Sequence, residues 1–163
     1  MAKTIRWGII GLGNIAQKFA QDLALVEDGE LVAIASRSMS KALNFNKEFH
    51  VTNVFDSYEE LFECDAVDVV YIATPHTEHM NWAILAMQNG KHVLCEKPMG
   101  VNGKQLSQMF ETAKKYKVFL MEALWSRFNP TIRKIKEIVD EGGLGTLEYI
   151  HADFAFYALD RAQ

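Results

Sequence analysis

The sequence is short of the features that mark several classes of protein. It has only two cysteines, Cys64 and Cys95, whose spacing fits neither a metal site nor a disulfide framework, so we expect reduced thiols. No apolar run approaches the ~20 residues that a membrane-spanning helix needs, and the first strand begins too early to leave room for a signal peptide. The net charge of -4 provides no basic surface for nucleic acid or an anionic membrane. We therefore expect a cytoplasmic protein that binds neither.

What is present begins with a glycine turn. A short apolar segment, residues 5–10, runs into Gly11-Leu12-Gly13-Asn14-Ile15-Ala16, which has the form G-x-G-x-x-A. In the dinucleotide-binding fingerprint the first glycine makes the turn, the second lets the backbone approach a pyrophosphate, and the third small residue allows close packing of helix on strand. The following helix N-terminus, with Asn14 and Ile15, offers N–H groups to phosphates. A purely structural turn is the alternative.

The rest of the chain alternates apolar strands with amphipathic helices joined by short loops. This order predicts an α/β fold, a Rossmann-type doubly wound parallel sheet. We expect the first helix to face the sheet with a stripe of Ile15, Phe19, Leu23 and Val26. Further strands are expected at 31–35, 54–55, 67–72, 92–95 and 118–121, and helices at 14–25, 40–49, 57–62, 77–88 and 103–116, with Ser57 and Asn102 as capping residues. A last helix is expected to start at Asn129-Pro130 and to be closed by Gly142-Gly143.

The last stretch does not fit that sheet. Residues 147–158 alternate like a long strand, with Ile150, Ala152, Phe154 and Phe156 on one face. Such a strand needs neighbours, and none remain in the chain. It pairs across a dimer, or it is the first strand of a second α/β domain that continues beyond residue 163, which we favour. The predicted domains are therefore 1–122, which binds a dinucleotide, and 123–163, which holds a linking helix and the start of a substrate and oligomerisation domain.

The segment after the second strand bears on which dinucleotide is bound. NAD-selective sites place an acid there, on the ribose 2′-hydroxyl, and this chain has none. Ser36, Arg37 and Ser38 instead offer two hydroxyls and a guanidinium, which suit a 2′-phosphate. We therefore expect NADP, with NAD as the alternative; a solvated surface arginine is the other interpretation of Arg37.

Two further loops follow strands of the same sheet. Thr74, Pro75 and His76 end the fourth strand, on the side where open α/β sheets bind ligands, and His79 is expected on the same helix face as His76. His76 is a candidate for contact with cofactor or substrate, and a solvated or helix-capping role for one histidine is the alternative. We expect no metal, because no acid suits the pair.

Glu96-Lys97-Pro98 ends the fifth strand, and places Lys97 at the same sheet edge. A partly desolvated lysine there can transfer a proton. Glu96 can orient that lysine or bind the cofactor, and Pro98 can adopt the cis form, which is a minority state for such bonds. On its own, the tripeptide is an ordinary surface ion pair.

Together these motifs resemble the N-terminal half of the Gfo/Idh/MocA family of NAD(P)-dependent oxidoreductases. The resemblance rests on the glycine turn, on Thr74-Pro75 with His79, and on residues 90–98. Residues 121–130, Met-Glu-Ala-Leu-Trp-Ser-Arg-Phe-Asn-Pro, are similar to the dimeric dihydrodiol dehydrogenase and glucose–fructose oxidoreductase branches.

The resemblance implies hydride transfer between nicotinamide and a small-molecule substrate, a sugar, polyol or cyclic alcohol or ketone, with Lys97 as proton donor or acceptor. It implies that His76 and Trp125 lie near the nicotinamide or substrate and Arg127 near the cofactor, although Trp125 and Arg127 can equally brace the domain junction as an aromatic–cation pair. A second domain, beyond residue 163, would complete the active site and the oligomer interface. The alternatives are a non-catalytic dinucleotide-binding regulatory protein and a structural fragment; a sensor would not need Lys97.

Overall fold

The computed structural model of the chain describes residues 4–155. The chain forms two compact units, Met1–Leu124 and Trp125–Gln163. Across the described residues, no helix combines the length and the apolar character that crossing a bilayer would require.

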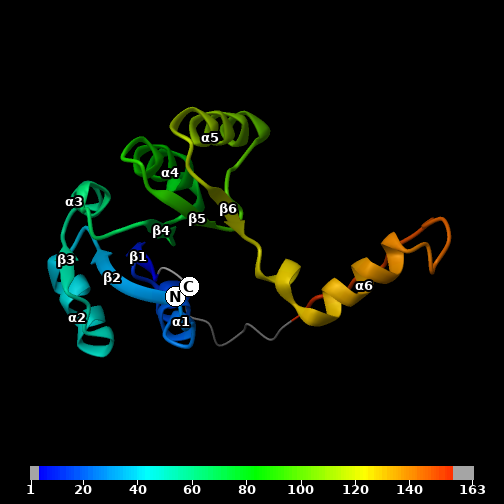
Figure 1. The fold of residues 1–163 in the computed structure, drawn as a ribbon, viewed down its shortest axis with the longest axis horizontal. Coiled ribbons are helices and arrows are strands. Elements are labelled where there is room, and N and C mark those ends of the chain that lie inside the picture. The colour runs from blue at the N-terminus through cyan, green and yellow to red at the C-terminus, as the bar shows by residue number, and fades with distance from the viewer. Residues whose placement is uncertain (1–3, 156–163) are drawn as a thin grey trace. The chain divides into compact units, whose positions relative to one another are not determined.

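The first unit is built on a six-stranded, entirely parallel sheet (Figure 1). Its strand order, β3-β2-β1-β4-β5-β6, is that of the Rossmann fold, and the predicted doubly wound sheet is confirmed. The strands are β1 Ile5–Ile10, β2 Gly29–Ala35, β3 Asn53–Phe55, β4 Val69–Ile72, β5 His92–Glu96 and β6 Leu120–Ala123.

The register of the sheet brings the carboxyl ends of its strands level. Ile10 pairs with Ala35 on one side and with Ile72 on the other, Ile72 pairs with Cys95, and Cys95 pairs with Glu122. The residues that follow these positions therefore emerge side by side at one edge of the sheet, although they are far apart in sequence.

Helices cover both faces of the sheet (Figure 1). The side chains of α1 (Asn14–Leu23) and α2 (Met39–Phe49) pack with one buried cluster, and those of α3 (Tyr58–Glu63), α4 (His79–Gln88) and α5 (Gly103–Tyr116) with the other. The predicted stripe of α1 is partly wrong, because Ile15 and Val26 are both 47% exposed. Ala16 and Ala20 are buried together with Leu23, and Phe19 packs against the same cluster as the two alanines.

Contacts at helix ends explain where α3 and α5 begin and where β6 begins. Ser57 and Asn102 accept hydrogen bonds from Glu60 and Gln105 backbone N–H groups and so cap α3 and α5, as predicted. Strand β6 starts two residues later than predicted, at Leu120. The reason is that the N–H of Val118 still donates to the carbonyl of Ala113 in the C-terminal cap of α5.

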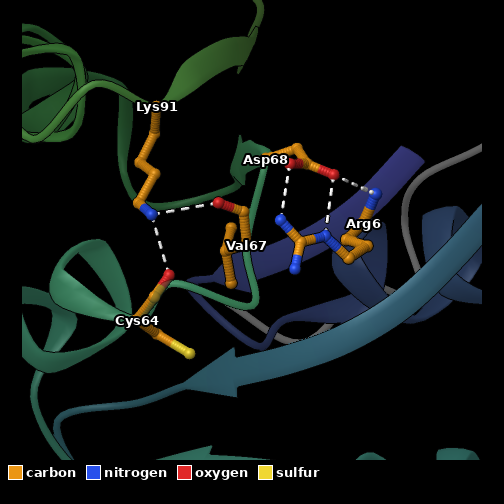
Figure 2. Close-up of polar contacts among 5 residues, drawn as sticks. All are labelled: Arg6, Cys64, Val67, Asp68 and Lys91. Carbon is orange, nitrogen blue, oxygen red and sulfur yellow. Dashed lines mark hydrogen bonds and ion pairs between the residues drawn. The ribbon is translucent and has the colours of Figure 1, made fainter. Parts of the chain in front are cut away.

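The amino edge of the sheet is held by two polar contacts, shown in Figure 2. Arg6 donates to both carboxylate oxygens of Asp68, through Nε at 2.9 Å and Nη2 at 2.8 Å. The Lys91 side chain is 8% exposed, and its Nζ donates to the carbonyls of Cys64 at 2.7 Å and Val67 at 3.0 Å. Both contacts tie the start of β4 to neighbouring segments at the edge opposite the strand carboxyl ends.

The second unit contains the 3₁₀ helix η2 (Trp125–Phe128) and α6 (Pro130–Asp140). The side chain of Asn129 caps α6, whose first residue is a proline as predicted. Residues 147–155 form no strand, so the strand predicted there is corrected over that range; residues 156–158 lie outside the described residues. A strand is defined by hydrogen bonds to a partner strand, and alternation of apolar residues alone supplies none.

Candidate functional site

A hollow of about 570 Å³ opens at the carboxyl edge of the sheet. It combines the turn after β1 with the segment after β2 and the loop after β4. The sheet register explains this, because those three segments leave adjacent strands at the same level. The lining residues are 11–13, 36–38 and 73–75, together with Lys41 and Tyr58.

The two glycines of the turn are small for different reasons. Gly11 has a φ of +80°, and a Cβ there would lie 2.6 Å from the carbonyl carbon and oxygen of Ala73 and from the backbone nitrogen of Thr74. Gly11 is therefore required by the fold. A Cβ on Gly13 would meet no atom of the described part of the chain within 4 Å. The packing of the chain itself therefore does not require a glycine at position 13. The missing side chain leaves space in the hollow, which Gly13 lines.

The N-terminus of α1 follows this turn without a side-chain cap and with no acidic residue in its first turn. Asn14 and Ile15 are its first residues, and both are exposed. The first backbone N–H groups of a helix have no partner inside the helix. Those of α1 are consequently available to an anion, and the helix dipole favours one.

The segment after β2 is partly used by the protein itself. The Ser36 side chain is buried, and its Oγ accepts from the Ser38 backbone N–H at 3.4 Å. Ser38 caps α2 by accepting from the backbone N–H of Lys41. The Arg37 guanidinium is exposed and lies 3.4 Å from a carboxylate oxygen of Glu78. The structure thus places all three residues at the hollow, with the two hydroxyls also engaged in local turns.

Lys41 and Tyr58 line the hollow as well, and sequence reasoning missed them. Lys41 lies three residues into α2 from the capping Ser38, so its position could have been inferred from the cap. Tyr58 comes from α3 after the third strand and is 4% exposed. Burial raises the pKa of Tyr58, while the neighbouring Arg37 acts to lower it. No sequence signal connects Tyr58 with the glycine turn.

Thr74 brings an unsatisfied polar atom to the wall of the hollow. Its Oγ1 is buried and has no hydrogen-bond partner among residues 4–155. Buried hydroxyls are rarely left in this state, so this atom marks a place where a polar ligand group would find a partner. Pro75 follows it, is exposed, and also lines the hollow.

The two histidines of the β4 loop are in different surroundings, which corrects the expectation that they share a helix face. His76 is exposed and begins the 3₁₀ helix η1 (His76–Glu78). His79 is 1% exposed. Its Nε2 lies 2.8 Å from the Thr74 carbonyl oxygen, and its Nδ1 lies 2.9 Å from the Pro98 carbonyl oxygen. The ring of His79 therefore joins the loop after β4 to the loop after β5.

Three side chains hold the backbone around Lys97. Glu96 accepts from the N–H of Lys97 at 3.1 Å, Glu122 accepts from the N–H of Met99 at 2.9 Å, and His79 contacts the carbonyl between them. The Lys97–Pro98 peptide bond is cis. Glu96 thus orients the Lys97 backbone, and the Lys97 side chain is exposed at the carboxyl edge of the sheet.

The remaining predicted site residues, Trp125 and Arg127, belong to the second unit and are exposed. Over residues 4–155, no three or more His, Cys, Asp and Glu side chains gather in a way that could hold a metal ion.

Comparison with known proteins agrees with this geometry. Residues 5–124 match the family model described as "Oxidoreductase family, NAD-binding Rossmann fold" of the Gfo/Idh/MocA proteins. The chain is 41% identical over 154 residues to trans-1,2-dihydrobenzene-1,2-diol dehydrogenase of Mus musculus, covering 93% of this chain and 46% of that protein. It is 37% identical over 161 residues to the Xenopus tropicalis enzyme of the same name, covering 96% and 49%.

Solved structures show the same relationship. Scyllo-inositol dehydrogenase from Lactobacillus casei, with bound NAD(H) and scyllo-inositol, is 28% identical with a TM-score of 0.81, over 88% of this chain and 43% of that one. A 3-ketoreductase from Actinomadura kijaniata, in complex with TDP-benzene and NADP, is 34% identical with a TM-score of 0.80, over 86% and 44%. The chain spans about half the length of the curated relatives it matches. By its sequence and its sheet, this chain belongs to the Gfo/Idh/MocA oxidoreductase family.

Proposed function

We propose that this chain is the cofactor-binding half of an NADP-dependent oxidoreductase that acts on a sugar, polyol or cyclic alcohol or ketone. The observation that carries the proposal is the hollow itself, where the glycine turn, Arg37 and Thr74 meet at the carboxyl edge of a Rossmann sheet. Residues 123–163 would then begin a substrate domain. The relatives named above act on a diol, an inositol or a keto group, which supports this substrate class.

The residues of the hollow fit a dinucleotide. The uncapped N-terminus of α1 suits a pyrophosphate, and Gly13 leaves room for it without any demand from the fold. Arg37 and Lys41 provide two cations where the adenosine ribose binds in Rossmann folds. The Thr74 hydroxyl, orphaned in the structure, would gain a partner.

The bound nicotinamide would supply the hydride chemistry, and the chain would supply position and a proton. Lys97 emerges from β5, next to β4 in the sheet, so its exposed Nζ leaves the same edge as the hollow. An ammonium there can give a proton to a carbonyl oxygen being reduced, or its neutral form can take one from a hydroxyl being oxidised. The three contacts on its backbone fix where that amine starts.

Titration of the purified chain with NADPH and NADH, followed by cofactor fluorescence, tests the proposal. We expect both to bind and NADPH to bind more tightly. Arg37→Ala should weaken NADPH far more than NADH, because only NADPH carries the 2′-phosphate. Gly13→Ala should weaken both alike while leaving the fold intact, since its Cβ meets no protein atom. Lack of binding of either cofactor contradicts the proposal, and equal losses in Arg37→Ala contradict the preference for NADP.

A further inference from the structure

The sequence has no acid directly after β2, but a carboxylate from another part of the chain lies beside Arg37. Glu78 ends η1, and its Oε1 lies 3.4 Å from Nη1 of Arg37, which is 41 residues earlier. The Glu78 side chain is 31% exposed, compared with 65% for Arg37. A carboxylate and a guanidinium therefore stand together beside the segment that reads the adenosine ribose in Rossmann folds.

Glu78 is held in place independently of Arg37. Its second oxygen, Oε2, accepts a hydrogen bond of 3.0 Å from Nε1 of Trp82, one turn along α4. The Trp82 ring packs edge-to-face against Tyr58 with centroids 4.9 Å apart, and Tyr58 lines the hollow. The carboxylate is consequently held beside Arg37, which lines the hollow: Trp82 anchors one of its oxygens, and the other lies toward the guanidinium.

The charges of Glu78 and Arg37 act on the same place. Both change the pKa of Tyr58, which burial raises: the guanidinium lowers it and the carboxylate raises it further. A phosphate monoester carries about −1.5 to −2 charges at neutral pH, so a nearby carboxylate repels it and competes for the guanidinium. A ribose 2′-hydroxyl suffers neither effect, and a carboxylate is the usual acceptor for it.

We propose that Glu78 is a specificity-determining residue of the dinucleotide site, which reduces the preference for NADPH over NADH by sharing Arg37 with the 2′-phosphate. The inference rests on the proposed function. It adds to that function a reason why the site accepts both NADPH and NADH instead of excluding NADH. Arg37 and Lys41 bind the 2′-phosphate, and Glu78 determines how strongly Arg37 binds it.

Glu78→Gln tests this in the complete chain, because glutamine keeps the size of the side chain and can still accept from Trp82. We expect the ratio of NADH to NADPH dissociation constants to rise about three- to five-fold, as for a partly exposed ion pair. Glu111→Gln removes the same charge from an exposed position on α5 and should leave the ratio unchanged. In the Arg37→Ala background the Glu78→Gln gain in NADPH affinity should be clearly smaller, because only the direct repulsion between the carboxylate and the phosphate remains to be relieved.

The outcomes separate this inference from the function on which it rests. If neither cofactor binds the wild-type chain, both are overturned. If both cofactors bind and Glu78→Gln leaves the ratio unchanged or lowers it, only the role of Glu78 is overturned. A gain of the same size with and without Arg37 overturns the sharing of Arg37.

Discussion

The hydroxyl of Tyr71 donates a hydrogen bond of 2.6 Å to Oε1 of Glu96. Tyr71 lies in β4 and is 2% exposed, with its ring stacked on Phe19 at a centroid distance of 3.9 Å. The other carboxylate oxygen of Glu96 accepts from the backbone N–H of Lys97. The buried Tyr71 thus holds the carboxylate of Glu96, and this carboxylate in turn holds the backbone of Lys97, where the loop after β5 begins.

Replacing Tyr71 by phenylalanine should therefore loosen this loop without disturbing the core. The ring keeps its contact with Phe19, but one oxygen of Glu96 loses its donor, which costs about 1–2 kcal/mol of unfolding free energy. Urea unfolding measures the loss, and amide hydrogen exchange should quicken at Lys97. Tyr116→Phe, at the exposed end of α5, is the matched control and should change neither. Unchanged exchange at Lys97 contradicts the link through Glu96.

His76 and His79 allow the contributions of an exposed and a buried histidine to the unfolding free energy to be compared. His79→Ala should lower the unfolding free energy by about 2–4 kcal/mol, because it opens a cavity and removes the ring that lies between the carbonyl oxygens of Thr74 and Pro98. His76→Ala, three residues earlier and exposed, should change it by less than about 0.5 kcal/mol. Thermal or urea unfolding checks both, and similar losses would contradict the structural role of His79.

The sequence patterns were informative wherever one segment decides its own structure. Apolar runs predicted the six strands, and Ser57 and Asn102 were correctly predicted as helix caps, because a cap bonds only to its own first turn. The glycine turn between β1 and α1 was predicted for the same reason, because its motif lies within one short segment.

Contacts that depend on strand register could not be predicted. Tyr71 meets Glu96 because β4 lies beside β5 with Ile72 opposite Cys95, and no local pattern encodes that alignment. The ion pair of Arg37 with Glu78 joins the ends of β2 and β4, which are not even adjacent. For residues 147–155 the failure is of another kind, since alternation shows that a segment could be a strand but not that a partner exists.

Lys91 supports the amino edge of the sheet, far from the hollow. Its Nζ donates to two carbonyls, those of Cys64 at the end of α3 and of Val67 (Figure 2). Lys91→Met fills similar space but leaves the Val67 carbonyl without its donor, while the Cys64 carbonyl keeps the backbone N–H of Val67 at 3.1 Å. We therefore expect the unfolding free energy to fall by about 1–3 kcal/mol. Cofactor affinity should not change. Lys104→Met, exposed in α5, is the control, and a loss as large in that variant would contradict the assignment.

Stability should decline at alkaline pH because of Cys95. The side chain is fully buried, and burial, followed by Glu96 and Glu122, raises the pKa of its thiol from 9.0 to about 12. Between these values the unfolded chain loses the thiol proton while the folded chain keeps it. The unfolded state then binds fewer protons, so unfolding free energy falls as pH rises, by roughly 1 kcal/mol at pH 10 from this group.

Cys95→Ser and Cys95→Ala remove the titrating group and should flatten this decline between about pH 9 and 12, whatever their cost at neutral pH. Urea unfolding at closely spaced pH values measures the slope. Tyr71, whose pKa burial and Glu96 raise above its ordinary 10.0, adds a second loss that begins about one unit higher and that Tyr71→Phe should remove. If neither Cys95 substitution alters the slope of unfolding free energy against pH, the decline at alkaline pH does not come from the thiol of Cys95.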